Sequence, residues 1–522
     1  MSLTLATDVL VIGGGLAGTW AAIAAAREGA EVVLADKGYC GTSGVTATAG
    51  PGHWWVPPEA REAAVADRLT RSLGLGDPDW MRRILDLTWI SLPTLRGYYD
   101  FSTDDQGQPF YRGLRGPEYM RAMRKLALDQ GVRILDHHPA LELLRHGDGS
   151  IAGAAGLALR GERPWTIRAG AVVLATGGCA FASRLLGSAT NTGDGLLMGV
   201  EAGADLSGME FSNYYTPAMA GTNMARSMAY SFARWFDADD RELDIPPGPD
   251  VTPNLARALL LGPLYCRLDR VPEDIRRVMP QVQPNFVLPF ARWGVDAYRD
   301  RFEVTLHPEG TVRGIGGLRV VDEACQTQVP GLFAVGDAAS RELVTGAISG
   351  GGAVNSSWAL SSGQWAGAGA ARLARGQGAR AEDLAVATGR AGLRPHRAAR
   401  PVDVRAAVQT VRDELNAYDL NIFRRGPALV RSAERLDDVW TDLAAHARGE
   451  GRASLRAREA AALVAAGRWS KASALARRES RGMHRREDAP GLDPRFASRQ
   501  RAAGLDRVWT AFEPVAAQAE VA

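Results

Sequence analysis

The chain has 522 residues, 46% of them hydrophobic, and its 61 basic and 59 acidic residues leave a net charge of +2. This length favours two or three domains, and the hydrophobic fraction excludes wholesale disorder. The balanced charge argues against a nucleic acid or an anionic membrane as a partner. No apolar run reaches the roughly 18 residues of a membrane span, and a predicted strand begins by Asp8, which leaves no room for a signal peptide. We therefore expect a cytoplasmic protein without a transmembrane segment.

The four cysteines are scattered and form no CxxC pair, and no histidine stands at metal-ligand spacing from them. This distribution predicts neither a disulfide framework nor a zinc site nor an iron–sulfur cluster in the chain. We expect each thiol to be a small buried apolar group.

The first motif is a glycine-rich turn between a predicted strand over residues 8–12 and an alanine-rich helix over 19–27. Gly13 permits a tight turn, Gly15 lets a pyrophosphate approach the backbone, and Gly18 lets the helix pack closely on the strand. A second strand over 31–35 delivers Asp36, where a ribose hydroxyl needs an acceptor. The order predicts a dinucleotide-binding unit, whose turn also includes Leu16 and Ala17.

The segment over residues 37–52 is made mostly of small, hydroxylated and glycine residues. It cannot build much core, but it offers backbone amides and hydroxyls at close approach to a flat or phosphorylated ligand. Because it directly follows the strand that carries the acid, we predict a second cofactor-facing loop, with contacts from Lys37, Gly41, Thr42 and Ser43.

The next stretch is predicted to be helical over 59–99, with breaks at 74–78 and at Pro93, and again over 117–130. Strands are predicted over 132–136, 140–144 and near 151–159. A fully apolar strand at 171–175 then leads into Thr176-Gly177-Gly178, as in a return to a parallel sheet.

From this point the sequence resembles the flavoprotein subunits of succinate dehydrogenase and fumarate reductase, whose superfamily includes L-aspartate oxidase and the adenylylsulfate reductase flavoprotein. The resemblance is carried by six motifs in the same order as in that superfamily: Ala-Thr-Gly-Gly at 175–178, Thr-Asn-Thr-Gly-Asp-Gly at 190–195, Met-Glu-Phe at 209–211, a second FAD signature at 327–338, a glycine-rich helix start at 350–357 and a C-terminal signature at 478–488. Together with the opening turn these motifs extend from residue 8 to residue 488.

The resemblance implies an α/β fold in three parts. A Rossmann-like FAD-binding domain of the glutathione-reductase type would comprise residues 1–210 and 312–400, an α+β capping domain would be inserted at 211–311, and a helical domain would follow at 401–522. The residue patterns agree, because 212–300 is irregular and proline-rich, whereas the chain from 401 is rich in Ala, Arg, Leu and Glu with helical periodicity.

The resemblance also implies which residues contact FAD. They are Ala175, Thr176 and Gly177 after the apolar strand, Asp194, the pair Gly336 and Asp337, and Asn355 and Ser356 at the flavin ring. A helix that starts in the 350–356 run would aim its positive end at the flavin and stabilise negative charge on the reduced ring. The family's histidine that tethers FAD covalently aligns with Thr42 or Ser43, so we predict non-covalent FAD.

The positions that handle substrate differ from those of the dicarboxylate-acting relatives. The carboxylate-clamping arginine is replaced by Gly351, one histidine by Tyr215, and a second by Val312 or Arg313. The proton-donating arginine of the capping domain aligns near Glu273, with Arg276 and Arg277 close by. We take Tyr215, Arg313, Arg276 and Arg277 as catalytic candidates, with simple packing as the alternative for Tyr215 and Arg313.

These features predict an FAD-dependent oxidoreductase that moves a hydride between flavin N5 and a small organic substrate. The candidate substrates are carboxylates or amino-acid-like compounds, but not succinate, fumarate or aspartate, because a bidentate carboxylate partner is missing. The alternative is a flavin-binding electron-transfer or structural subunit of a complex, without turnover of its own. The candidate assemblies are a complex with a partner subunit for electron transfer and a homo-oligomer.

Overall fold

The computed structural model describes residues 2–103, 106–224, 227–377 and 385–514. Apolar residues at 9–12, 32–35 and 171–174 are buried on both faces, which is why they form the centre of a mainly parallel sheet. The strand order is β15-β4-β5-β6-β1-β2-β3, and β14 also pairs with β6. The strands are β1 (Leu3–Ile12), β2 (Val32–Ala35), β3 (Arg133–Leu135), β4 (Ala140–Arg145), β5 (Ile151–Ala158), β6 (Arg163–Leu174), β14 (Leu332–Ala334) and β15 (Val386–Ala387).

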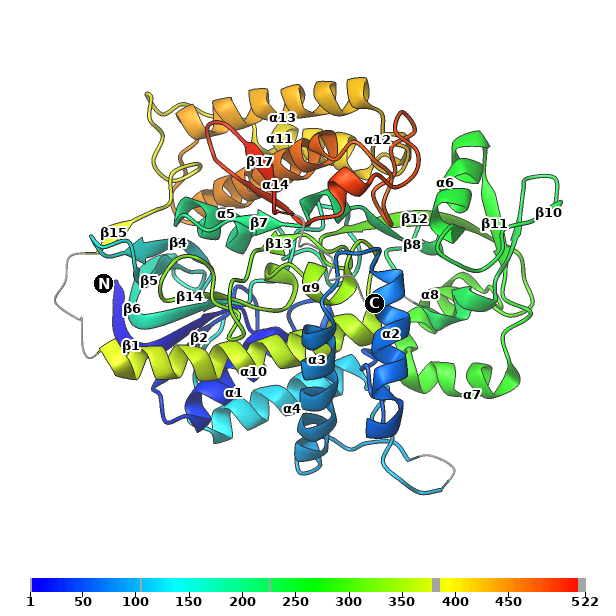
Figure 1. Ribbon diagram of the computed structural model, residues 1–522, viewed down its shortest axis with the longest axis horizontal. Coiled ribbons are helices and arrows are strands. Elements are labelled where there is room, and N and C mark those ends of the chain that lie inside the picture. The colour runs from blue at the N-terminus through cyan, green and yellow to red at the C-terminus, as the bar shows by residue number, and fades with distance from the viewer. Residues whose placement is uncertain (1, 104–105, 225–226, 378–384, 515–522) are drawn as a thin grey trace, which may run out of the picture.

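Helices flank this sheet. The helix α1 (Leu16–Arg27) and the long helix α10 (Gly351–Gln377) pack together along one face of it (Figure 1). A Cβ on Gly363 of the long helix would lie 2.4 Å from the carbonyl oxygen of Ala17, so glycine there permits the close approach of the two backbones. The helices of this domain are α1 (Leu16–Arg27), α2 (Arg61–Arg71), α3 (Pro78–Ser91), α4 (Gly116–Asp129), α5 (Asp194–Glu201), α9 (Glu342–Thr345) and α10 (Gly351–Gln377).

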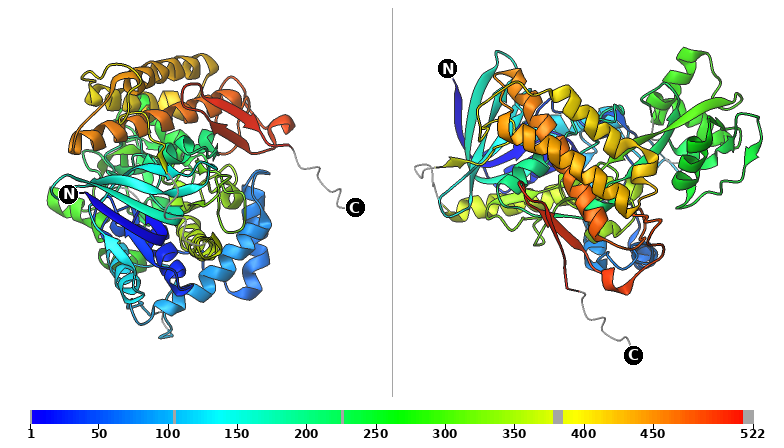
Figure 2. Two further views of the ribbon diagram at one scale, coloured as in Figure 1. Left: turned by 90° about the vertical axis from the view of Figure 1, so that its left-hand side faces the viewer. Right: turned by 90° about the horizontal axis from the view of Figure 1, so that it is seen from above.

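The capping domain is a separate unit that projects from the rest of the molecule (Figure 2, right). Its antiparallel sheet has the order β10-β9-β11-β12-β8 and packs in a second hydrophobic cluster, to which Ile422 and Phe423 of the C-terminal part also contribute. The strands are β8 (Tyr214–Met219), β9 (Arg234–Phe236), β10 (Glu242–Leu243), β11 (Leu264–Arg267) and β12 (Phe302–Gly310), and the helices are α6 (Val251–Leu261), α7 (Glu273–Val282) and α8 (Pro284–Trp293).

The C-terminal part contains the expected helices α11 (Val404–Asn416), α12 (Tyr418–Asn421), α13 (Gly426–His446) and α14 (Arg452–Ala476). It also contains a hairpin that the helical pattern did not predict, formed by β16 (Gln500–Ala503) and β17 (Trp509–Phe512). This hairpin extends a small sheet of the FAD-binding domain, made of β7 (Leu206–Ser207) and β13 (Gly317–Leu318). The C-terminal hairpin is therefore integrated with the first domain, and residues 1–210, 211–311, 312–400 and 401–522 stay our proposed division.

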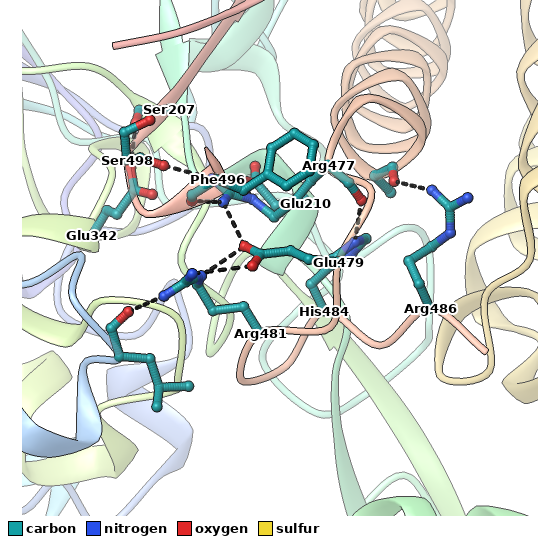
Figure 3. A network of polar contacts seen from close by, with 12 residues as sticks. Ser207, Glu210, Glu342, Arg477, Glu479, Arg481, His484, Arg486, Phe496 and Ser498 are labelled. Atoms are coloured by element: carbon teal, nitrogen blue, oxygen red, sulfur yellow. Dashed lines mark hydrogen bonds and ion pairs between the residues drawn. The ribbon is translucent and has the colours of Figure 1, made fainter. Parts of the chain in front are cut away.

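A buried ionic network fastens the C-terminal signature to the FAD-binding domain (Figure 3). Arg477 is fully buried and pairs with Glu210 at 2.7 Å and with Glu479 at 3.0 Å. Glu479 in turn accepts hydrogen bonds from Arg481, whose guanidinium also reaches a backbone carbonyl in the loop after α2. Near it Glu342 accepts a hydrogen bond from Ser207. Because charges this deeply buried must be paired, the network fixes how the two domains meet.

In the described part of the chain, no helix is long and apolar enough to cross a membrane. The four cysteines are buried and free. Among the same residues, no group of three or more His, Cys, Asp or Glu side chains is placed to hold a metal ion.

Candidate functional site

A cavity of about 790 Å³ lies between the FAD-binding domain and the capping domain. Its size falls in the range of ligand pockets. Most of the cofactor residues predicted from sequence line it: Gly13, Gly15, Leu16, Ala17, Asp36, Lys37, Ser43, Ala175, Thr176, Gly177, Asp194, Gly336, Asp337, Asn355 and Ser356. They come from the ends of β1, β2, β6 and β14 and from the starts of three helices, so the carboxyl edge of the sheet gathers them.

The glycine turn after β1 is shaped by close contacts. Gly13 has φ +109°, and a Cβ there would lie 2.3 Å from the carbonyl oxygen of Ala175. A Cβ on Gly18 would lie 1.8 Å from the carbonyl oxygen of Gly13, so Gly18 serves the packing of α1 and does not line the cavity. A Cβ on Gly15 would meet no protein atom within 4 Å. The turn thus leaves open space at Gly15, where a pyrophosphate needs backbone contact.

Asp36 organises the loops on this side of the cavity. Its carboxylate accepts hydrogen bonds from the amides of Gly14 (2.5 Å) and Gly38 (2.6 Å) and from Ser43 Oγ (3.0 Å). Burial raises the pKa of this carboxyl, although the hydrogen bonds oppose the shift. The acid therefore holds the glycine turn and the following loop together at the point where a ribose is expected.

Lys37 is engaged by acids from two other parts of the chain. Its Nζ lies 2.7 Å from Asp194 at the start of α5 and 2.6 Å from Glu459 on α14. Burial works against the charge of Lys37, but the two carboxylates outweigh it and raise the pKa of the ammonium group. Glu459 was not among the sequence-predicted residues, and no local pattern connects it to Lys37.

Four other predicted residues do not line the cavity. Gly41 packs against α4, and Thr42 Oγ1 donates to the carbonyl oxygen of Tyr39 on the surface. Arg276 donates to backbone carbonyls at residues 269 and 271 within the capping domain, and Arg277 is exposed on α7. In this conformation neither arginine reaches the space beneath the cap.

The helix α10 begins beside the cavity, at the end where the flavin ring is expected. Asn355 is 9% exposed, and neither its Nδ2 nor its Oδ1 has a hydrogen-bond partner among the described residues. A buried amide normally has partners, so this one is suited to a ligand in the cavity. Nearby, Asp337 pairs with Arg341, which also donates to the carbonyl oxygens of Thr311 and Gly314 and thereby ties the second FAD signature to the residues after β12.

At the capping end, Arg313 is the cation that lines the cavity. Its guanidinium lies 4.6 Å from the centroid of the Tyr214 ring, and its Nη1 lies 3.6 Å from Glu309 Oε1. Glu309 is fully buried at a β-bulge in β12 and accepts a hydrogen bond from Thr216. Burial works against the charge of Arg313, but Tyr214 and Glu309 outweigh it and raise the pKa of the guanidinium. Arg313 is therefore held as a cation.

Tyr215 lines the cavity, but its hydroxyl is hydrogen-bonded to the C-terminal helices. It is 1% exposed, and its hydroxyl donates to the carbonyl oxygens of Leu415 (3.4 Å) and Asn416 (3.2 Å) at the end of α11. Burial raises the pKa of this phenol well above its ordinary value. These contacts favour the packing alternative, since a hydroxyl bonded to two carbonyls and hard to ionise is a poor acid or base. Its neighbour Tyr214, which sequence reasoning missed, carries Arg313 on its ring.

Two protein-family models match the chain. Residues 8–197 match the model of FAD-dependent oxidoreductases, and residues 413–516 match that of the fumarate reductase flavoprotein C-terminus. Among the relatives is a subunit of the fumarate reductase (CoM/CoB) of Methanothermobacter marburgensis, which is 26% identical over 94% of this chain and 95% of its own length. The matches identify the chain as an FAD-dependent oxidoreductase, similar to the flavoproteins of the succinate dehydrogenase and fumarate reductase superfamily.

Two further comparisons support this assignment. The L-aspartate oxidase of Mycobacterium leprae is 28% identical over 94% of this chain and 94% of its own length. The fold matches that of E. coli quinol fumarate reductase with a TM-score of 0.82, at 20% identity, over 98% of this chain and 97% of that chain. The residues of the cavity fit FAD, because the turn is open to a diphosphate at Gly15, and the Asn355 amide, which has no hydrogen-bond partner among the described residues, lines the same cavity.

Proposed function

We propose that this flavoprotein moves a hydride between FAD and a small organic substrate bound beneath the capping domain. FAD, held non-covalently along the glycine turn, Asp36 and the start of α10, supplies the two-electron chemistry. The residues of the chain bind and orient the substrate and exclude water from it.

The observation that carries this proposal is that Asn355 and Arg313 line the same cavity. The Asn355 amide, without a hydrogen-bond partner among the described residues, lines one side, and Arg313, a partly buried cation on a tyrosine ring, lines the end next to the cap. Amides at the flavin edge and cations at an anionic substrate group are the polar elements that such sites need. The capping residues enclose the space between them, which supports a substrate pocket rather than a bare cofactor groove.

We further propose that succinate, fumarate and aspartate are not the substrates. The names of the relatives make fumarate and aspartate the first candidates to test. However, Gly351 stands where those enzymes are expected to carry an arginine, and a glycine offers no side chain to a carboxylate. One arginine clamp is thereby lost from the pocket.

Electrons must leave the reduced flavin, and we propose that their acceptor is a partner subunit, with oxygen and a quinone as the competing acceptors. The support is that one full-length relative is itself named as one subunit of a fumarate reductase. The second candidate function, a flavin-binding subunit without turnover of its own, is favoured by the same relative and by the changed positions Tyr215 and Gly351.

The experiment is anaerobic mixing of the purified holoprotein with amino acids, hydroxy acids, enoates and saturated acids, followed at the visible flavin band. Reduction or reoxidation by a panel member supports the enzyme function, and an Asn355→Leu variant should retain its fold while reacting more slowly. A full panel without reaction, together with stable co-purification of a partner, would favour the subunit function. Acid precipitation should release the flavin into the supernatant, because no covalent bond is expected.

A further inference from the structure

The capping side of the cavity carries no charge among the described residues. Sixteen residues between 214 and 283 line the cavity there, and all have uncharged side chains or none. Arg313, which follows β12, is the cation that faces them, and its side chain is 21% exposed. The other cation in the lining, Lys37, is occupied by two acids at the dinucleotide end. Arg313 has one longer contact to an acid, Glu309 at 3.6 Å, so it is the cation that can bind an anionic group in this pocket.

The carboxylates that line the cavity are not placed to bind an ammonium group under the cap. Asp36, Asp194 and Asp337 are the carboxylates that line the cavity in the described part of the chain, and they follow β2, start α5 and follow β14. Each belongs to the dinucleotide side and is engaged by amides, by Lys37 or by Arg341. A substrate ammonium under the cap would be desolvated without a carboxylate partner, which is unfavourable.

The capping wall instead offers apolar area. Met228 is 48% exposed and lines the cavity. Tyr230 and Trp235 also line it, and their rings stack nearly parallel at 6.3 Å. Ile245, in the segment before α6, and Val251, the first residue of α6, also line the cavity. A hydrocarbon body placed against these side chains would bury apolar surface, whereas a second carboxylate there would lose its hydration without gaining a cation.

We propose that the substrate is a monocarboxylate with a ring or branched hydrocarbon body, whose carboxylate binds Arg313 and whose body packs against Met228 and the aromatic wall of the cap. This inference rests on the proposed function, because it names the substrate class of the same site. It separates this chain from an enzyme for dicarboxylates or for amino acids. Glu309 and Tyr214 hold the guanidinium in place for the single carboxylate.

The test compares four ligands by isothermal titration calorimetry on the FAD-saturated protein, which requires no turnover. They are 3-phenylpropionate, propionate (no ring), 3-phenylpropan-1-ol (no carboxylate) and succinate (a second carboxylate in place of the ring). We expect 3-phenylpropionate to bind at least about tenfold more tightly than each of the others, since the loss of a few apolar carbons or of a charged partner has effects of that size. An Arg313→Gln variant should bind 3-phenylpropionate and the alcohol alike.

A gain of function provides the second arm. Met228→Lys adds a cation to the exposed apolar wall, so it should strengthen binding of the dianion 3-(4-carboxyphenyl)propionate by up to about fivefold, as a partly exposed ion pair can. The matched control is Leu261→Lys, which adds the same charge to the same domain at a side chain 91% exposed and outside the cavity. The control should leave the binding of every ligand unchanged.

Succinate binding as tightly as 3-phenylpropionate, or equal effects of Met228→Lys and Leu261→Lys, would overturn the inference. These outcomes are distinct from a failure of the proposed function. If the predicted order of binding holds while no ligand of the panel reduces or reoxidises the flavin, the substrate class stands and the redox assignment is at fault.

Discussion

Replacing Glu342 with glutamine should change how the stability of the protein depends on pH. Glu342 is 1% exposed at the start of α9 and accepts a hydrogen bond from Ser207 (Figure 3). Burial and then the nearby charge of Glu210 raise the pKa of this carboxyl to about 8, against the opposing effects of Ser207 and Arg477. Glutamine keeps the shape of the side chain and does not titrate.

The magnitude follows from proton linkage. The folded-state pKa of about 8 lies above the reference value of 4.5, so the folded chain retains a proton that the unfolded chain releases. The stabilisation by this proton is complete below pH 4.5 and is lost as the pH rises to about 8. Within that window the free energy of unfolding falls by about 1.4 kcal/mol per pH unit. Between two measurements two pH units apart, the variant should gain up to about 2.7 kcal/mol over the wild type.

The assay is urea unfolding of the FAD-saturated protein between pH 5.5 and 7.5, followed by tryptophan fluorescence. Glu323→Gln is the matched control, because the Glu323 side chain is 85% exposed and its replacement should leave the pH dependence as it is in the wild type. Parallel pH curves for the wild type and the Glu342→Gln variant would refute the reasoning, since they would mean that Glu342 binds its proton equally well in both states.

Three other changes test the site and its support. The Gly15→Ala variant should fold but lose FAD, because its Cβ would point into open cavity space. The ratio of visible to ultraviolet absorbance measures the bound FAD. In the control Gly97→Ala the new Cβ also meets no protein atom within 4 Å but lies outside the cavity, so this variant should keep FAD. Arg477→Met should lower the free energy of unfolding in urea by about 3–5 kcal/mol, because it leaves the Glu210 carboxylate buried without a cation; a loss under about 1 kcal/mol would contradict a paired network. The Tyr215→Phe variant should lose about 1 kcal/mol of the free energy of unfolding and keep the pH profile of turnover. If one ionisation disappears from that pH profile, Tyr215 acts as an acid or base after all.

The features that could be predicted from sequence are those set by neighbouring residues. The glycine turn is one, because the positive φ of Gly13 and the close packing at Gly18 arise from contacts within one strand–turn–helix unit. The apolar strand before Thr176 is another, since a run buried on both faces indicates a parallel sheet whatever surrounds it. Such local requirements leave a readable pattern of residue types.

The features that could not be predicted are contacts between residues far apart in the chain. Arg477 pairs with Glu210 across 267 positions, and Lys37 pairs with Glu459 on a helix of another domain. Arginines, lysines and acids are also the usual residues of solvated helix faces, so the sequence alone does not reveal which of them are buried. The hairpin β16–β17 was missed for a similar reason, because its pairing partner β7 lies almost three hundred residues earlier.

The substrate side shows a subtler limit, which concerns the direction of a side chain. The resemblance to the family put Tyr215 at the position of a histidine, but adjacent residues of a strand point to opposite faces. In β8 this alternation turns the Tyr215 hydroxyl to the end of α11 and places Tyr214 under the guanidinium of Arg313. An aligned position therefore fixes the place along the strand, while packing against the C-terminal helices leaves Tyr214, and not Tyr215, in contact with Arg313. Because those helices supply the carbonyls that bind Tyr215, the chemistry under the cap depends on the domain farthest from it in sequence.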